Sequence, residues 1–233
     1  MDIKIPYTPR KHQAYLHKKI DTHRWNVLVC HRRFGKTVCM INHLIRSALL
    51  SKLSNPRFAY IAPTFKQAKS IAWDYMKQFT AKIPHTKFNE TELRVDLPNG
   101  SRITLLGSES PDGLRGIYLD GCVIDEYANV NSKLFPEIIR PALSDRKGYC
   151  VFIGTPMGMN NNFYELYQHA QSAEDWFNYK AKASDTKIVD DDELIKAKEV
   201  MGEKKYMQEF ECDWIANIEG SVYGDVIAKL DDD

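Results

Sequence analysis

The sequence predicts a three-layer α/β fold, in which a mostly parallel sheet with an added β-hairpin lies between two layers of helices. Short apolar runs alternate with stretches of helical periodicity, the pattern of strand–helix–strand crossovers. With 233 residues, of which 43% are hydrophobic, the chain can bury one sizeable core. No repeat or low-complexity linker interrupts the first 215 residues. We therefore expect one domain over residues 1–219 and the start of a linker at 220–233.

The elements of this fold follow from local patterns. Strands are expected where short apolar runs end at turn residues, at 25–30, 58–62, 118–124, 149–153 and 177–181. Helices are expected where apolar residues recur at helical spacing, at 38–49, at 67–81, around Leu134, Ile138 and Ile139, and twice in the acidic segment after 181.

The hairpin is expected from residues 92–97 and 102–106. These runs flank Pro98, Asn99 and Gly100, which favour a tight turn. We expect this hairpin to run antiparallel to the rest of the sheet.

Charge and cysteine usage limit the classes of function. The net charge is +1, so contact with a polyanion requires a local patch. Residues 1–24 carry six Lys or Arg against two acids, whereas residues 185–233 carry fifteen acids against six bases. The five cysteines form no CxxC pair, which indicates buried free thiols in a reducing compartment. No segment resembles a signal peptide or a membrane span, so we expect a soluble intracellular protein with no membrane partner.

The segment CHRRFGKT, residues 30–37, predicts a phosphate-binding loop. It stands between an expected strand and an expected helix, whose N-terminus favours phosphate. Lys36 can reach the terminal phosphates of ATP, and the Thr37 hydroxyl can bind Mg²⁺. Cys30 replaces the first glycine of the usual pattern, and a lone GKT also occurs by chance at helix starts. The residues expected to bind the nucleotide here are His31, Arg32, Arg33, Phe34, Gly35, Lys36 and Thr37.

Two adjacent carboxylates follow a later apolar strand. Asp125 and Glu126 come directly after the run GCVI, where a strand end can place them beside the phosphate loop. We assign Asp125 to magnesium and Glu126 to activation of the attacking water. The alternative is the start of a solvated loop, but the buried strand before the pair disfavours it.

Thr155, in the triplet GTP, follows the expected strand at 149–153. A polar residue at this position senses the terminal phosphate in many P-loop ATPases, although GTP alone is also an ordinary turn. If Glu126 is catalytic, the strand at 149–153 should lie between the strands at 25–30 and 118–124.

These motifs together resemble the large terminase subunits of tailed phages. RRFGKT resembles the family's phosphate loop, with Arg32 as its arginine, VIDEYA its Walker B strand, and GTP its coupling motif. The resemblance implies a RecA-like P-loop ATPase that uses ATP and Mg²⁺ to translocate double-stranded DNA into a procapsid. It also implies a homo-oligomeric ring on a capsid portal, a small terminase subunit as partner, and the host cytoplasm as location.

The resemblance extends to two further segments. Tyr7, Pro9, Arg10 and Gln13 resemble the adenine-side element of terminases and helicases, in which an aromatic or proline packs on the base and Gln reads its edge. A polar helix cap is the alternative interpretation of these four residues. The segment APTFKQAK, 62–69, resembles a helicase-type motif that faces DNA, where its lysines, Lys66 and Lys69, can contact phosphates or simply be solvated.

Arg115 lies in a polar, glycine-rich segment, 108–116. Terminases with LRG at this place are thought to insert its arginine into the nucleotide site of an adjacent subunit, where it offsets charge on the phosphoryl oxygens. The alternative is that Arg115 pairs with a nearby acid of its own loop, such as Asp112 or Asp120.

Two rival functions remain at this point. A helicase-type DNA-dependent ATPase shares DExx and APTxxQA, but it needs a second core domain, for which the residues after 182 leave no room. A nucleotide-binding scaffold without turnover has no need of Glu126. The nuclease domain of complete large terminases is also not expected here, because residues 220–233 are too few to hold its carboxylate cluster.

Overall fold

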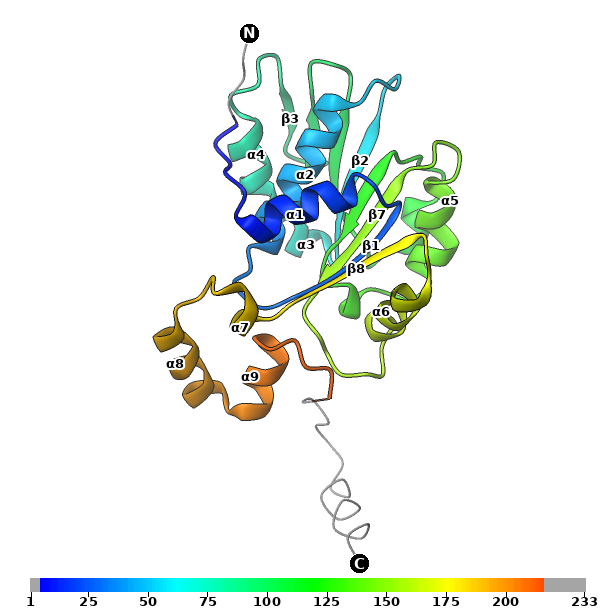
Figure 1. Cartoon of the computed structure of the whole chain (residues 1–233). Coiled ribbons are helices and arrows are strands. Elements are labelled where there is room, and N and C mark those ends of the chain that lie inside the picture. Colours follow the sequence, from blue (N-terminus) through cyan, green and yellow to red (C-terminus); the bar gives the residue numbers. More distant parts are fainter. Residues whose placement is uncertain (1–4, 216–233) are drawn as a thin grey trace, which may run out of the picture.

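The computed structural model describes residues 5–215, which form a three-layer α/β domain (Figure 1). Its sheet has eight strands in the order β3-β4-β5-β2-β6-β7-β1-β8. The strands are β1 (Trp25–Cys30), β2 (Arg57–Ala62), β3 (Lys87–Asn89), β4 (Arg94–Asp96), β5 (Arg102–Gly107), β6 (Gly121–Ile124), β7 (Tyr149–Gly154) and β8 (Trp176–Ala181). The predicted position of β7, between β1 and β6, is therefore confirmed.

Helices cover both faces of the sheet. The helical segments are α1 (Lys11–Ile20), α2 (Lys36–Leu50), α3 (Phe65–Gln67), the π-helical η1 (Ala68–Trp73), α4 (Asp74–Thr80), the short η2 (Pro111–Leu114) and η3 (Tyr127–Asn129), the π-helical η4 (Leu134–Ile139), α5 (Arg140–Ala142), α6 (Asn162–Ser172), α7 (Ala183–Thr186), α8 (Asp191–Met201) and α9 (Glu203–Glu209). Residues of α1, α2, η1 and α4 share one apolar core with the sheet, and residues of η4 and α6 share the other. Figure 1 shows α7, α8 and α9 as a small lobe that follows β8.

The predicted strands are apolar because they are buried in the core. All six residues of β1 are buried, because both faces of this strand are covered by helices. The five cysteines are buried and free, as expected. Within residues 5–215, no helix combines the length and the apolar composition that a membrane crossing requires.

The prediction for the hairpin was wrong in one respect. Residues of β4 and β5 do pair antiparallel, but β5 itself runs parallel to β2, from Arg57 opposite Arg102 to Ala62 opposite Gly107. The chain returns from β2 through α3, η1 and α4 on one face of the sheet and then reverses twice through β3 and β4. After the second reversal, β5 runs in the same direction as β2. Strand β4 is therefore antiparallel to both of its neighbours.

Several boundaries also differ from those predicted. The helix expected at 67–81 begins at Phe65, because Thr64 and Gln67 form a capping box at its start. Strand β6 begins only at Gly121, directly after Asp120, whose carboxylate accepts the Arg57 N–H at 2.7 Å. The acidic segment forms three helices instead of two. The predicted domain boundary at 220 lies outside the described residues.

Candidate active site

The loop between β1 and α2 has free N–H groups at the start of a helix. Gly35 has a φ of 86° and Arg33 a φ of 70°, so the backbone turns sharply before α2 begins at Lys36. In the described part of the chain, no acceptor binds the N–H groups of Arg33, Gly35, Lys36 or Thr37. With the positive end of the α2 dipole, these donors form a site for an anion.

Lys36 lies across the ends of two neighbouring strands. Its ammonium donates to the carbonyls of Cys30 at 3.3 Å and His31 at 3.4 Å, and to the Thr155 hydroxyl at 3.1 Å. Because β1 and β7 are adjacent and parallel, their carboxyl ends bring Lys36 and Thr155 together. The structure thus joins two predicted site residues that are 119 positions apart in the sequence.

Asp125 and Glu126 follow β6, the next strand of the sheet. Both Asp125 oxygens are held, one by the Tyr60 phenol, which donates to it, and one by the Glu126 N–H at 2.9 Å. Burial raises the pKa of Asp125, and burial together with the Asp125 charge raises the pKa of Glu126. The positive charge of Lys36 acts in the opposite direction and lowers the pKa of both carboxyls.

Tyr60 interacts with both predicted metal ligands, Asp125 and Thr37. Its phenol donates to Asp125, and the Thr37 hydroxyl lowers the pKa of the same phenol. A hydroxyl and a buried carboxylate are oxygen donors of the kind that Mg²⁺ prefers, so these residues fit the predicted ion. Sequence reasoning did not single out Tyr60, because a tyrosine within an apolar strand is ordinarily a core residue.

The C-terminal lobe contacts the same loop. Arg32 donates its N–H to the Glu209 carbonyl at 2.8 Å, and its guanidinium lies 3.8 Å from the Glu209 carboxylate. Gln208, which is buried, donates to the Pro156 carbonyl at 2.6 Å, directly after Thr155. Sequence reasoning missed these two contacts, because no local pattern marks Gln208 or Glu209.

His31 points toward this lobe. Its imidazole hydrogen-bonds to the Thr186 hydroxyl at 2.8 Å, and its backbone N–H donates to the Ala181 carbonyl at 3.0 Å. Burial lowers the pKa of His31 and so favours the neutral ring. The structure gives His31 a contact that fixes the loop on α7, and the predicted contact with nucleotide stays a prediction.

The N-terminal element divides into two pairs of residues. Gln13 donates to the Gly35 carbonyl at 3.3 Å, and Arg10 donates to the Phe34 carbonyl at 3.4 Å. A Cβ atom at Gly35 would lie 2.9 Å from the Gln13 amide nitrogen, so α1 packs directly on the loop. Gln13 also caps the start of α1, because its side-chain oxygen accepts the Arg10 N–H at 3.0 Å, as the alternative interpretation expected.

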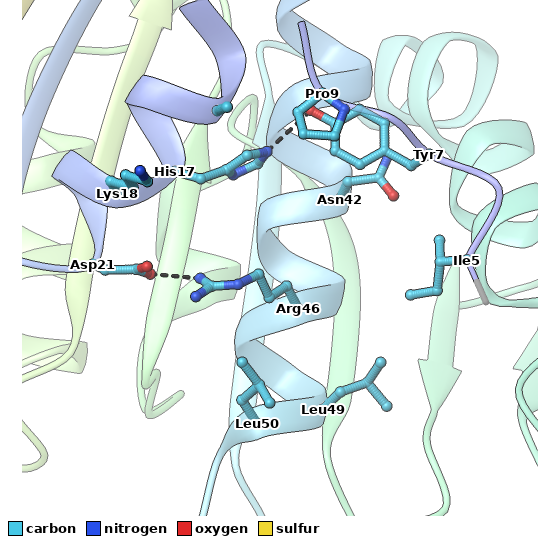
Figure 2. A pocket seen from close by; sticks show the side chains of 11 residues that line it. Ile5, Tyr7, Pro9, His17, Lys18, Asp21, Asn42, Arg46, Leu49 and Leu50 are labelled. Atoms are coloured by element: carbon cyan, nitrogen blue, oxygen red, sulfur yellow. Dashed lines mark hydrogen bonds and ion pairs between the residues drawn. The ribbon is translucent and has the colours of Figure 1, made fainter. Parts of the chain in front are cut away.

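Tyr7 and Pro9 lie in a different place. Figure 2 shows both beside a cavity of about 470 Å³ along α1 and α2, with Asn42 and Arg46 on its wall. The Tyr7 phenol hydrogen-bonds to His17 at 3.0 Å. The residues that line this cavity include none of the loop residues 30–37, whereas Arg10 and Gln13 bond to that loop.

Comparison with known proteins identifies the family. The family model described as "Terminase large subunit, T4likevirus-type, N-terminal" matches residues 29–224, which include the loop, both carboxylates and Thr155. The chain belongs to this large terminase family.

Similar terminases share the fold. The large terminase ATPase domain of Thermus phage P74-26 has a TM-score of 0.75 at 21% identity, over 91% of this chain and 96% of that one. The large terminase of a thermophilic bacteriophage, solved in complex with ADP, has a TM-score of 0.76 at 16% identity, over 88% of this chain and 53% of that one. These likenesses show the RecA-like P-loop fold of terminase ATPase domains.

Curated relatives are longer than the matched region. The terminase large subunit of Thermus phage G20c is 30% identical over 126 residues, which is 46% of this chain and 26% of that protein. A second large subunit, from Thermus virus P23-45, matches over the same lengths. The match thus spans about a quarter of these family members.

Arg115, which is predicted to act in an adjacent subunit, lies on the loop after η2. Its guanidinium lies 3.7 Å from the Glu137 carboxylate, and its side chain is 57% exposed. Asp120, one of the two acids expected as a partner, instead pairs with Arg146 at 3.3 Å. Glu137, an acid on η4, therefore lies near Arg115. The action of Arg115 in an adjacent subunit stays a prediction.

Lys66 and Lys69 are both exposed at the carboxyl edge of the sheet. They lie in α3 and η1, directly after β2. The neighbouring Phe65 N–H donates to the Glu109 carboxylate at 2.8 Å, so this helix start is tied to the loop that leads to Arg115. DNA contact by these lysines stays a prediction.

Proposed function

We propose that this domain hydrolyses ATP with Mg²⁺ and, as part of a large terminase, drives double-stranded viral DNA into a procapsid. One observation carries the proposal: Lys36, Thr155 and the Asp125–Glu126 pair meet at the carboxyl ends of the adjacent strands β1, β7 and β6. The family supports the packaging role. The ADP complex of the thermophilic phage terminase supports nucleotide binding by this fold.

Phosphate binding is assigned to loop 30–37. Its N–H groups and the N-terminus of α2 would hold the phosphates, and the Lys36 ammonium would contact the terminal one. A phosphate is a stronger acceptor than the carbonyls and the Thr155 hydroxyl that Lys36 contacts now. Nucleotide binding would therefore release Thr155, which supports its assignment as the sensor of the terminal phosphate.

Metal binding and water activation are assigned to different groups. Thr37 and Asp125 would hold Mg²⁺, which when bound neutralises charge on the β- and γ-phosphates. Glu126 would orient the attacking water and accept its proton. Burial and the Asp125 charge raise the pKa of Glu126 and so make it a stronger base, while Lys36 and the Thr155 N–H favour its ionised form.

Arginines would complete the site. Arg32 would neutralise phosphoryl charge from within its own loop, and Arg115 would do so from an adjacent subunit of a homo-oligomeric ring on the portal. Gln13 and Arg10, which bond to the loop, would form the adenine side, and Lys66 and Lys69 would face DNA. A small terminase subunit is the expected partner, and the host cytoplasm the expected location.

Phosphate release from ATP by the purified chain tests the proposal. We expect turnover that requires Mg²⁺, stops in EDTA and increases with added double-stranded DNA. Procapsids with portal, supplied with the complete subunit that carries this domain, should package DNA only when ATP is present. A chain that binds no nucleotide, or that hydrolyses ATP equally well without a divalent ion, would overturn the proposal.

A further inference from the structure

Tyr60 connects the two predicted metal ligands from a third element. It lies in β2, only 1% exposed, and faces the core that β2 shares with α2. In the sheet, Tyr60 pairs with Val123, and the Asp125 N–H donates to the Ile61 carbonyl at 2.8 Å. This register places the Asp125 carboxylate directly beyond Tyr60, within reach of its phenol.

The phenol interacts with both predicted ligands. It donates its proton to one Asp125 oxygen, and the Thr37 hydroxyl lowers the pKa of the phenol. Since the Glu126 N–H holds the other Asp125 oxygen at 2.9 Å, the carboxylate is oriented at both of its oxygens. One rigid aromatic side chain therefore orients the carboxylate that is assigned to magnesium, beside Thr37 at the start of α2.

We propose that Tyr60 is a positioning residue: its side chain holds Asp125 and Thr37 in the arrangement that Mg²⁺ needs. This inference rests on the proposed function. Partners that orient metal ligands are part of most metal sites, and their loss lowers metal affinity by about 10–100-fold. The alternative is that the phenol only needs an acceptor for a buried hydroxyl, and that Asp125 happens to be near.

The chain offers a matched control in Tyr149. This tyrosine lies in β7, packs against the same core, and donates to the Ser47 hydroxyl at 3.1 Å, where no predicted site residue is involved. Tyr60→Phe and Tyr149→Phe each remove one internal hydrogen bond and keep the ring. Both variants should fold, with similar small decreases in Tm.

The measurement is the Kd of a fluorescent ADP, in excess Mg²⁺ and in EDTA, for the purified chain. The wild type should bind more tightly in Mg²⁺. Tyr60→Phe should reduce this gain about tenfold and leave the Kd in EDTA unchanged, whereas Tyr149→Phe should keep the full gain. An unchanged gain in Tyr60→Phe would overturn the positioning role while the proposed function stands. A wild type that gains nothing from Mg²⁺ would overturn the proposed metal site and the inference with it.

A double-mutant cycle covers the case in which Tyr60→Phe alters the whole domain. If Tyr60 acts through Asp125, adding Tyr60→Phe to Asp125→Asn should produce no further loss of the Mg²⁺ gain. A further loss of the same size as in the wild type would show that Tyr60 acts independently of Asp125 and would overturn the inference.

Discussion

Arg32 of loop 30–37 and Glu209 of α9 are joined twice. The Arg32 N–H donates to the Glu209 carbonyl at 2.8 Å, and the guanidinium lies 3.8 Å from the Glu209 carboxylate. The arginine assigned to phosphoryl charge is thus paired with an acid of the C-terminal lobe. A nucleotide at the loop would compete with Glu209 for this guanidinium.

Neutralising Glu209 should therefore tighten nucleotide binding. Glu209→Gln frees the Arg32 guanidinium and removes a negative charge that also raises the pKa of Glu126. We expect the Kd for ATP in Mg²⁺, measured by fluorescence titration, to decrease several-fold. Glu211→Gln is the control, because Glu211 bonds to Ser184 at 2.6 Å and not to the loop. Equal affinities in all three proteins would mean that Arg32 and the nucleotide do not compete.

The assigned roles of Lys36 and Glu126 predict different defects. Lys36→Ala removes the point charge at the terminal phosphates, so ATP affinity should decrease. Glu126→Gln should keep affinity and lower kcat by about a hundredfold or more, as expected for a lost general base. Binding titrations and steady-state kcat separate the two. If both variants lose affinity equally, the division of roles is wrong.

A contribution of Arg115 to a neighbouring site predicts dependence on assembly. Activity per subunit in the wild type should increase with protein concentration or with portal-bound assembly, because the site is completed only when subunits meet. Arg115→Ala should abolish that increase and leave ATP affinity nearly unchanged. Arg146→Ala is a control for the loss of an arginine, since Arg146 pairs with the buried Asp120.

Mixing experiments give the decisive comparison for Arg115. Arg115→Ala mixed with Glu126→Gln should recover part of the activity through interfaces that combine an intact Glu126 with an intact Arg115. A mixture that stays inactive, together with wild-type activity that is flat with concentration, would make Arg115 structural through its contact with Glu137.

The stacked pair His17 and His43 predicts loss of stability in acid. Their rings are 5.3 Å apart, and burial lowers the pKa of His17 to about 4 and that of His43 to about 3. Since unfolded histidine titrates near pH 6.5, both stay neutral in the fold, and their contribution is full above about pH 6.5. It should be lost as the pH decreases toward 4, by up to about 1.4 kcal/mol per pH unit for each histidine.

Unfolding as a function of pH checks this expectation. His43→Asn should flatten the dependence of the free energy of unfolding between pH 6.5 and pH 4, relative to the wild type. The exposed His85 provides the control variant, His85→Asn, which should keep the wild-type slope. An unchanged slope in His43→Asn would show that the acid sensitivity has another origin.

The sequence alone was sufficient for features that depend on contiguous residues. The turn at 30–37 between a strand and a helix was predictable, because Gly35 marks the turn and local periodicity marks both the strand and the helix. The position of β7 between β1 and β6 was also predicted correctly, since the proposed chemistry requires Glu126 and Thr155 at adjacent strand ends.

The tertiary structure decided what depends on residues far apart in the chain. The direction of β5 follows from its register with β2, and neither hairpin arm encodes that register in its own residues. The Tyr60–Asp125 bond spans 65 positions and the His31–Thr186 bond spans 155. Such contacts form only when the sheet and the C-terminal lobe are packed, because each side chain is an ordinary polar or aromatic residue in its local sequence. The sequence therefore determined which chemical groups the site contains, and packing determined which groups hold them in place.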